Sequence, residues 1–178
     1  AGPLERQLSK LDADPVRLPR FIPIEQLIPP LDPFTEIQRP KDLVFENGLG
    51  GFSSDGREYL IYLERDQWTP APWTNVIATA GFGCLVSESG MGTTWSQNSG
   101  ENRLTPWRND PVSDSPSEAI YLRDEDTGQI WSPTPLPARA DAPYLIRHGA
   151  GYSIFEHASH GLEQSVTIFV APDEPVKI

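Results

Sequence analysis

The fold class is decided by the stretch Leu162-Glu163-Gln164-Ser165-Val166-Thr167-Ile168-Phe169-Val170. Leu, Gln, Val, Ile and Val alternate with Glu, Ser, Thr and Phe over these nine residues. Side chains of a β-strand point alternately to its two faces, so a period of two is typical of a strand with one buried face. The stretch therefore predicts a β-strand, and it is the clearest one in the sequence.

Shorter patterns elsewhere also indicate strands. Residues 58–63 and 82–87 are short runs rich in aromatic and branched side chains. Residues 119–123 and 129–132 flank Asp124–Gly128, whose acidic residues and final glycine predict a hairpin connection. The 19 prolines and 14 glycines favour many short segments separated by turns. We expect an all-β layered structure.

Composition limits the protein's size class and partners. A chain of 178 residues, 38% of them hydrophobic, can bury one sizeable core, so we expect one domain with a tail. A net charge of -11 repels phosphate backbones and anionic membrane surfaces, so we expect neither nucleic acid nor direct membrane contact. The single cysteine, Cys84, cannot form an internal disulfide and is predicted to be a small buried hydrophobe. With no export-type apolar segment, these features predict a cytoplasmic location.

The N-terminal region differs from the rest of the chain. Leu4, Leu8 and Leu11 have helical spacing, but seven prolines between residues 15 and 40 break any regular structure after them. We interpret residues 1–43 as an extended proline-rich connector. The β-domain is predicted to occupy residues 44–178.

Residues 94–110 form the best candidate binding segment. This loop-like stretch combines two tryptophans with arginine, asparagine and carboxylate side chains. An indole ring can cover the apolar face of a sugar while planar polar groups reach its hydroxyls. A surface loop pinned by two half-buried tryptophans is the alternative that the residues leave open. The candidate substrate-binding residues are Trp95, Asn98, Glu101, Arg103, Trp107, Arg108 and Asn109.

Motifs for phosphate or metal binding are weak. The glycine-rich Asn47–Phe52 precedes a turn rather than a helix, so we interpret it as a turn between strands and not as a phosphate loop. His157 and His160 have HxxH spacing, but they fall at a strand end and in a turn, which is a poor frame for a metal. We expect no metal site and no cofactor.

Catalytic motifs are also lacking. The carboxylates of Asp124–Asp126 fall at a hairpin tip, where water rather than an apolar wall sets their pKa. Ser89 and Ser153 lack the strand-turn-helix setting of a nucleophile elbow. The residues therefore predict no catalytic set in this chain.

A series of motifs in one order does resemble a known family. The chain from Val44 to Ile178 resembles the start of the glycoside phosphorylase module of cyclic β-1,2-glucan synthases and, more distantly, cellobiose-type phosphorylases. The motifs that carry this resemblance are Asn47–Phe52, Trp68–Ala78, Val86–Gly90, the tryptophan-rich residues 94–110, Tyr121–Gly128, Trp131–Pro133, Arg147–Tyr152 and Pro175–Lys177.

The resemblance implies a fold and a reaction. The implied fold is an antiparallel β-sandwich of the galactose-mutarotase-like super-sandwich type, followed by a linker and a helical barrel. The implied reaction is inverting phosphorolysis with inorganic phosphate as co-substrate and no metal, and its catalytic aspartate and phosphate-binding residues lie downstream of the sandwich. Residues 173–178 stop where a further strand begins, so we expect a partial, non-catalytic domain. The resemblance leaves open whether the parent enzyme is anchored in the inner membrane.

Three roles follow as alternatives. The first is a sandwich that supports the absent helical-barrel domain and contributes to binding of a β-glucan oligosaccharide. The others are an independent carbohydrate-binding module and a protein-docking or oligomerisation domain. A missing strand next to residues 162–170 predicts self-association through an open edge and an uncovered apolar strip. That strip is Val166, Ile168 and Val170, and the tail residues able to cover it are Phe21, Ile22, Ile24 and Leu27.

Overall fold

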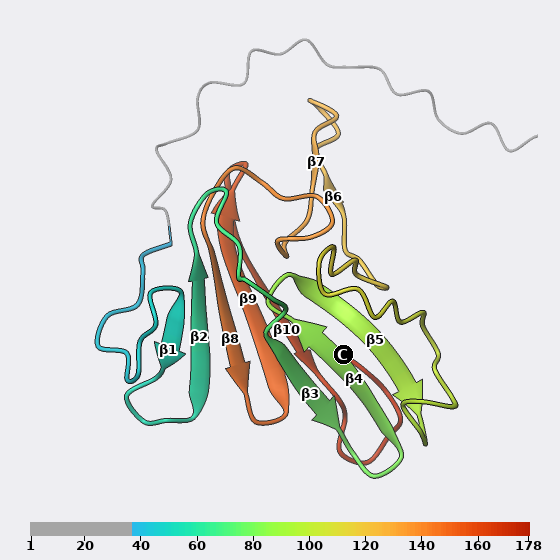
Figure 1. The fold of residues 1–178 in the computed structure, drawn as a ribbon. Helices are drawn as coiled ribbons and strands as arrows, with labels where there is room; N and C mark the ends of the chain where they lie inside the picture. Colours follow the sequence, from blue (N-terminus) through green and yellow to red (C-terminus); the bar gives the residue numbers. More distant parts are fainter. Residues whose placement is uncertain (1–36) are drawn as a thin grey trace, which may run out of the picture.

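The computed structural model describes residues 37–178, which form three antiparallel sheets (Figure 1). Among these residues there is no helix that could cross a membrane. The strands are β1 (Gly50–Phe52), β2 (Glu58–Leu63), β3 (Thr74–Ala78), β4 (Phe82–Ser87), β5 (Gly90–Ser96), β6 (Leu122–Arg123), β7 (Ile130–Trp131), β8 (Tyr144–Gly149), β9 (Tyr152–Ser159) and β10 (Leu162–Phe169).

The largest sheet has five strands in the order β1-β2-β8-β9-β10. Its last two strands pair from Leu162 opposite Ser159 to Phe169 opposite Tyr152. They are joined by His160 and Gly161, whose φ angles of 51° and 82° are the left-handed values that tight two-residue hairpin turns require. The turn chemistry and the alternating strand pattern therefore set the same register.

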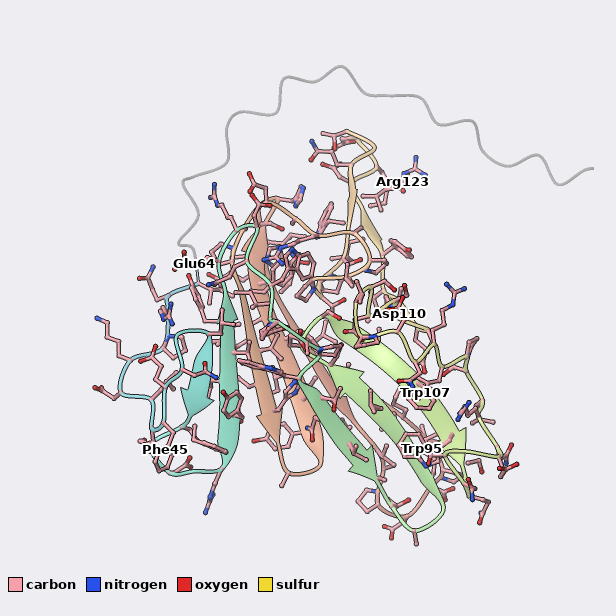
Figure 2. The ribbon with its side chains drawn as sticks, viewed as in Figure 1. Phe45, Glu64, Trp95, Trp107, Asp110 and Arg123 are labelled. Atoms are coloured by element: carbon pink, nitrogen blue, oxygen red, sulfur yellow. The ribbon has the colours of Figure 1, made fainter. Side chains whose placement is uncertain are left out.

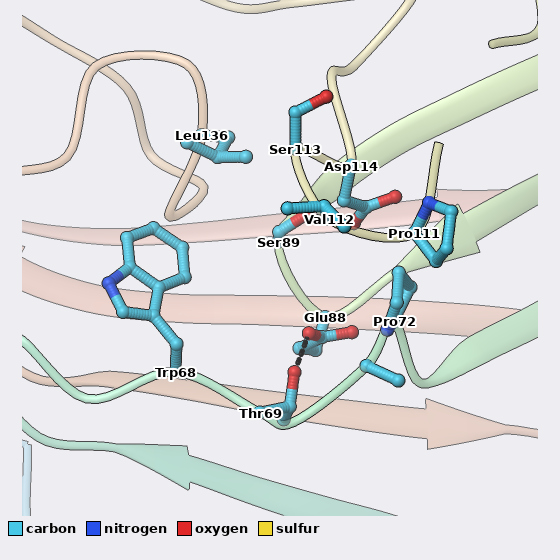
Figure 3. Close-up of a pocket in the computed structure, with 11 residues that line it drawn as sticks. Trp68, Thr69, Pro72, Glu88, Ser89, Pro111, Val112, Ser113, Asp114 and Leu136 are labelled. Carbon is cyan, nitrogen blue, oxygen red and sulfur yellow. Dashed lines mark hydrogen bonds between the residues drawn. The ribbon is translucent and has the colours of Figure 1, made fainter. Parts of the chain in front are cut away.

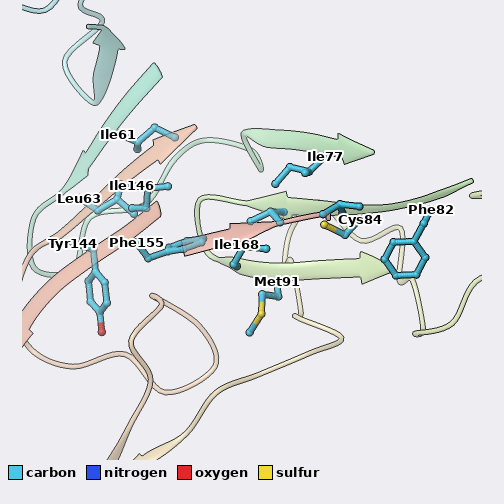
Figure 4. Packing of buried hydrophobic residues seen from close by; sticks show 12 residues of the cluster. Ile61, Leu63, Ile77, Phe82, Cys84, Met91, Tyr144, Ile146, Phe155 and Ile168 are labelled. Atoms are coloured by element: carbon cyan, nitrogen blue, oxygen red, sulfur yellow. The ribbon is translucent and has the colours of Figure 1, made fainter. Parts of the chain in front are cut away.

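The second sheet, β3-β4-β5, packs against the first to make a sandwich. Side chains from both sheets meet in one buried cluster, which Figure 4 shows from close by. Phe155 and Ile146 of the large sheet and Val86 of the small sheet are all fully buried there. The predicted all-β antiparallel sandwich is confirmed.

Cys84 lies in the same cluster. It is fully buried on β4, and burial raises the pKa of its thiol to about 11. Because the thiolate is the reactive form, this thiol behaves as a small apolar side chain, as the sequence predicts.

Several predicted elements have their expected bounds. β2 and β4 occupy residues 58–63 and 82–87, and β10 covers all but the last residue of the predicted strand. The predicted hairpin exists as the short pair β6 and β7. The Asp124 N–H donates to the Gln129 carbonyl at 2.9 Å across the turn.

The expectation of an uncovered apolar strip on β10 is wrong. Ile168 and Val170 are 3% and 8% exposed, and Val166 packs partly buried against the same core. The small sheet covers this face of β10 because both sheets contribute to one cluster. The tail residues proposed to cover the strip, Phe21, Ile22, Ile24 and Leu27, lie outside the described residues.

The end of β10 is paired with the final residues of the chain. Phe169 and Ile178 exchange two backbone hydrogen bonds of 3.0 and 2.9 Å. The Lys177 ammonium donates to Glu118 and to the Thr94 hydroxyl, the latter at 3.1 Å. These contacts tie the C-terminal segment to β5 and to the segment that follows it.

Candidate functional site

The segment that we call the tryptophan segment, residues 94–110, runs back along the outer edge of β5. Leu104 donates its N–H to the Thr94 carbonyl at 2.8 Å, and Ser96 donates to the Asn102 carbonyl at 3.0 Å. The segment thus acts as an irregular extra strand at this edge. Pairing of this kind limits the freedom of residues 97–110, which follow the end of β5 and contain no regular element.

Trp95 has a structural position on β5. A Cβ placed on Gly83 of β4 would lie 2.6 Å from the Trp95 ring carbon Cζ2 and 2.7 Å from Ala78 Cβ. The indole therefore lies directly over the Gly83 backbone, which only glycine permits. Its ring is used in packing within the small sheet.

Trp107 differs, because 44% of the residue is exposed. The Arg103 guanidinium lies 4.8 Å from the ring centroid, within the range of a cation–π contact. Arg103 also donates from Nε to the Ser99 carbonyl at 2.8 Å, which fixes the stacked arginine. Figure 2 shows Trp95 and Trp107 on the same side of the molecule, beside β5. Trp107 and Arg103 form the only stacked pair that the structure places within the described tryptophan segment.

The other candidate residues divide into two kinds. The Asn98 side-chain oxygen accepts the N–H groups of Gly100 and Glu101 at 2.7 and 3.0 Å, so Asn98 shapes a turn. Glu101, Arg108 and Asn109 are exposed, and the described residues offer their side chains no hydrogen bond or ion pair. These three side chains are available to a ligand or another protein.

A second site surrounds the hairpin turn between β4 and β5. An open cavity of about 300 Å³ lies beside Glu88 and Ser89, the two residues of this turn (Figure 3). We call it the turn pocket. It is lined by Trp68, Thr69, Ala71, Pro72, Glu88, Ser89, Pro111, Val112, Ser113, Asp114 and Leu136.

Glu88 is a buried carboxyl group at the floor of the turn pocket, with 3% of the residue exposed. Its Oε1 accepts the Thr69 hydroxyl, and its Oε2 accepts the Trp73 N–H at 2.7 Å. Burial raises the pKa of Glu88 above its usual value, and the nearby Asp114 carboxylate adds to the rise. The neutral form of this carboxyl is therefore favoured compared with a carboxyl in water.

Asp114 forms the second carboxylate of the turn pocket. Its Oδ2 accepts the hydroxyl of Ser87 at 2.5 Å and also that of Ser89. Within the part of the chain that the structure describes, Oδ1 accepts no hydrogen bond. One oxygen thus organises the buried serines, and the other remains for a donor from outside.

The apolar side of the turn pocket includes Trp68, which is 45% exposed. The Arg139 guanidinium lies 4.5 Å from its ring centroid and donates to the carbonyls of Glu64 and Gln67 at 2.7 and 3.0 Å. These bonds hold Arg139 against the indole. Sequence reasoning missed this pocket, although a carboxyl between two apolar strands, at Glu88, was a usable signal.

The remaining motifs have local roles. The Asn47 side chain accepts the N–H groups of Leu49 and Gly50 at 3.1 and 3.0 Å, so the glycine-rich stretch begins as a turn. Its second half, Gly50–Phe52, is strand β1, so the prediction of a turn over all of residues 47–52 is wrong there, because Gly50 to Phe52 pair with β2. Asp124 accepts two backbone N–H groups at the hairpin tip, and these bonds lower its pKa. The interpretation of this acidic stretch as a turn is confirmed.

The two HxxH histidines are held by packing. His157 is fully buried, contacts the Pro143 carbonyl and the Ser159 hydroxyl through its two ring nitrogens, and stacks on Tyr144. His160 stacks on Trp131 with ring centroids 4.0 Å apart. In residues 37–178 there is no group of three or more His, Cys, Asp or Glu side chains that could hold a metal.

Comparison with known proteins places these features in a family. Residues 57–178 match the family described as glycosyl hydrolase 94, supersandwich domain. The chain is 44% identical over 138 residues to the cyclic β-(1,2)-glucan synthase NdvB of Rhizobium meliloti (strain 1021), covering 77% of this chain and 5% of that protein. It is 36% identical over 132 residues to the N,N′-diacetylchitobiose phosphorylase of Vibrio furnissii, covering 72% of this chain and 16% of that protein.

A more distant relative is the solabiose phosphorylase of Paenibacillus borealis, 26% identical over 140 residues, which cover 74% of this chain and 17% of that protein. The chain thus spans only a small fraction of the length of the relatives that it matches. The family match covers most of the chain and all strands from β2 to β10. This chain therefore belongs to the supersandwich-domain family of glycosyl hydrolase 94.

Proposed function

We propose that residues 44–178 are the non-catalytic sandwich part of a larger glycoside phosphorylase or β-glucan synthase, in which they work beside a helical-barrel catalytic domain. The observation that carries this proposal is the family match. It is supported by the 44% identity to a cyclic β-(1,2)-glucan synthase, of which the matched residues cover only 5%. In such a parent enzyme, inorganic phosphate is a co-substrate and belongs to the catalytic domain.

The tryptophan segment makes the proposed contribution to substrate binding. Trp107 offers a half-exposed ring next to the Arg103 guanidinium, and Glu101, Arg108 and Asn109 are exposed around it. An aromatic face with neighbouring planar polar groups suits a glucan, whose rings have an apolar face and a rim of hydroxyls. Trp95 and Asn98 have structural roles in this segment, because Trp95 packs over Gly83 and Asn98 shapes a turn.

The isolated 178-residue chain is expected to catalyse nothing. In the turn pocket, the carboxyl groups of Glu88 and Asp114 accept protein hydrogen bonds on three of their four oxygens. The purified chain should be incubated with β-1,2-glucan and phosphate, and glucose 1-phosphate measured. Product above the level of a protein-free blank contradicts the non-catalytic role.

Glucan binding by the isolated chain is expected to be weak. If the catalytic domain supplies the other wall of the site, one wall alone gives a dissociation constant on the order of millimolar. NMR titration with β-1,2-gluco-oligosaccharides should produce shifts clustered on residues 94–110, and Trp107→Ala should remove them. Tyr121→Ala is the matched control, since Tyr121 is an exposed aromatic residue outside the segment, at 59% exposure.

An independent carbohydrate-binding module gives a different outcome. In that case the same titration yields an affinity on the order of micromolar that is lost in Trp107→Ala. A pure docking module shows no sugar-induced shift at all. The exposed Leu104 and Val112, at 57% and 93%, favour protein contact as the second candidate for this side of the molecule.

A further inference from the structure

We infer that the turn pocket binds one pyranose unit of a saccharide, at a site separate from the tryptophan segment. The two sites share no residue, because the pocket is lined by residues 68, 69, 71, 72, 88, 89, 111–114 and 136. The inference goes beyond the proposed glucan contact at residues 94–110. Its ligand class follows from the chemistry of the cavity.

The turn pocket exists because a hairpin turn is buried. Turns normally lie at the surface, where water satisfies their polar groups. Glu88 and Ser89 are nevertheless each only 3% exposed, and Trp68, Thr69 and residues 111–114 surround them. The Ser89 carbonyl accepts the Leu136 N–H at 2.7 Å, which brings a third segment to the cavity. Three distant segments thus converge on two polar residues.

The polar groups of the pocket suit a ligand that donates hydrogen bonds. Asp114 Oδ1 is free of protein donors in the described residues, while Oδ2 is held by the buried serines. The Ser113 and Thr69 side chains add hydroxyls at the rim. Sugar hydroxyls can donate to a fixed carboxylate, and bonds to a charged acceptor are the stronger kind.

The apolar groups of the pocket suit the flat side of a sugar ring. Figure 3 shows Trp68 on one side of the cavity and Val112 on the other, with Glu88 below Val112. Trp68 is 45% exposed and is held from outside the pocket by Arg139. A volume of about 300 Å³ is at the small end of ligand sites and suits one ring with part of a neighbour.

Other ligand classes fit less well. An anion such as phosphate is repelled by Asp114 and by the chain's net charge of -11. A bare metal cation gains nothing from the aliphatic wall of the pocket, and the described residues offer no group of three metal-binding side chains. A neutral polyol uses both the carboxylate and the apolar surface at once.

The test uses the 178-residue chain labelled with ¹⁵N at its tryptophan indoles. It is titrated separately with methyl β-glucopyranoside and with the β-1,2-linked glucose disaccharide. The expected result is a saturable shift of the Trp68 indole signal with a dissociation constant on the order of millimolar. Asp114→Asn and Trp68→Ala should each weaken binding at this site at least about tenfold. Trp107→Ala should leave the Trp68 titration unchanged.

The outcomes separate the two sites. A Trp107 shift without a Trp68 shift overturns the pocket and keeps the proposed glucan contact, whereas the reverse keeps the pocket alone. Pocket signals that respond to Ca²⁺ and to neither sugar also overturn the inference. If Trp68→Ala does not fold, Trp68→Phe replaces it, and an unchanged sugar affinity in both Asp114→Asn and Trp68→Phe overturns the inference.

Discussion

The tryptophan segment and the turn pocket both adjoin the β4–β5 hairpin, but they satisfy their polar groups in opposite ways. In the exposed part of the tryptophan segment the bonds are local: the Gly100 N–H donates to Asn98 Oδ1, and Arg103 Nε donates to the Ser99 carbonyl. In the turn pocket they are long-range, since Glu88 is bonded by Thr69 and Trp73, and Ser87 by Asp114. When a side chain of the exposed tryptophan segment is removed, water can replace its hydrogen bonds. Water cannot do so in the buried part of the turn pocket.

The largest effect is expected from Asp114→Ala in the turn pocket. It removes the acceptor of the Ser87 and Ser89 hydroxyls, which lie on residues only 3% exposed. Each unsatisfied buried group costs about 1–3 kcal/mol, so we expect the free energy of unfolding to fall by about 2–4 kcal/mol. Urea unfolding followed by fluorescence measures it.

Asp110→Ala is the matched control for this variant. Asp110 also accepts a serine hydroxyl, from Ser113 at 2.6 Å, but at an exposed turn where water replaces the lost group. Its effect should be clearly smaller than that of Asp114→Ala. Equal losses for the two variants contradict the contrast between buried and exposed polar groups.

Acid pH should lower the free energy of unfolding through His148, which bonds to Trp73 next to the residues of the turn pocket. His148 Nε2–H donates to the Trp73 carbonyl at 3.2 Å, and burial lowers the pKa of His148 from its usual 6.5 to about 4. The fold therefore favours the neutral ring, and this contribution is complete above pH 6.5 and is lost as the pH falls toward 4. We expect a loss of about 2–3 kcal/mol in unfolding free energy by pH 4.

The pH dependence can be assigned by comparing two proteins. His148→Gln removes the titrating ring, so its unfolding free energy should change less between pH 6.5 and 4 than that of the unaltered chain. Carboxylates such as Glu118, whose pKa is lowered, add a slope of the same sign in both proteins. Parallel curves for the two proteins rule out the role assigned to His148.

Gly83→Ala tests whether Trp95 is a structural residue of the tryptophan segment. The added methyl group would lie 2.6 Å from the Trp95 ring carbon Cζ2, so the ring must move. Overpacking of this kind costs about 1–3 kcal/mol. Gly81→Ala is the control, because its nearest neighbour is the flexible end of Gln97 at 3.3 Å. Thermal unfolding of both variants measures the difference. Equal unfolding temperatures for the two variants contradict close packing at Gly83.

The smallest stability effect is expected from Trp107→Ala. The residue is 44% exposed and its stacking on Arg103 is a surface contact, so the free energy of unfolding should change by no more than about 0.5 kcal/mol. Urea unfolding checks this value. A loss above about 2 kcal/mol identifies Trp107 as a structural residue and weakens the case for a ligand contact.

Sequence reasoning reached the strands by local rules. The alternation in residues 162–170 and the apolar runs at 58–63 and 82–87 coincide with β10, β2 and β4, because strand periodicity is a property of adjacent residues. Sequence reasoning did not predict that the small sheet covers the apolar face of β10. Ile168 is buried by this sheet, whose strands lie more than 70 residues earlier in the chain.

The sequence predicted only the part of the candidate site whose residues are neighbours along the chain. The tryptophan segment was visible because its distinctive side chains lie close together in sequence, although the separate roles of Trp95 and Trp107 were not. Trp95 is structural only because Gly83 lies opposite it on β4.

The sequence by itself determined that the chain is a β-protein, where its main strands and turns lie, and that it resembles the supersandwich of glycoside phosphorylases. These properties depend on patterns along the chain. Only the tertiary structure decided that Glu88 and Ser89 are buried, that Asp114 bonds the Ser87 and Ser89 hydroxyls, and that Trp68 faces them across a cavity. Burial of a turn depends on segments that are distant in sequence and meet only when both sheets pack.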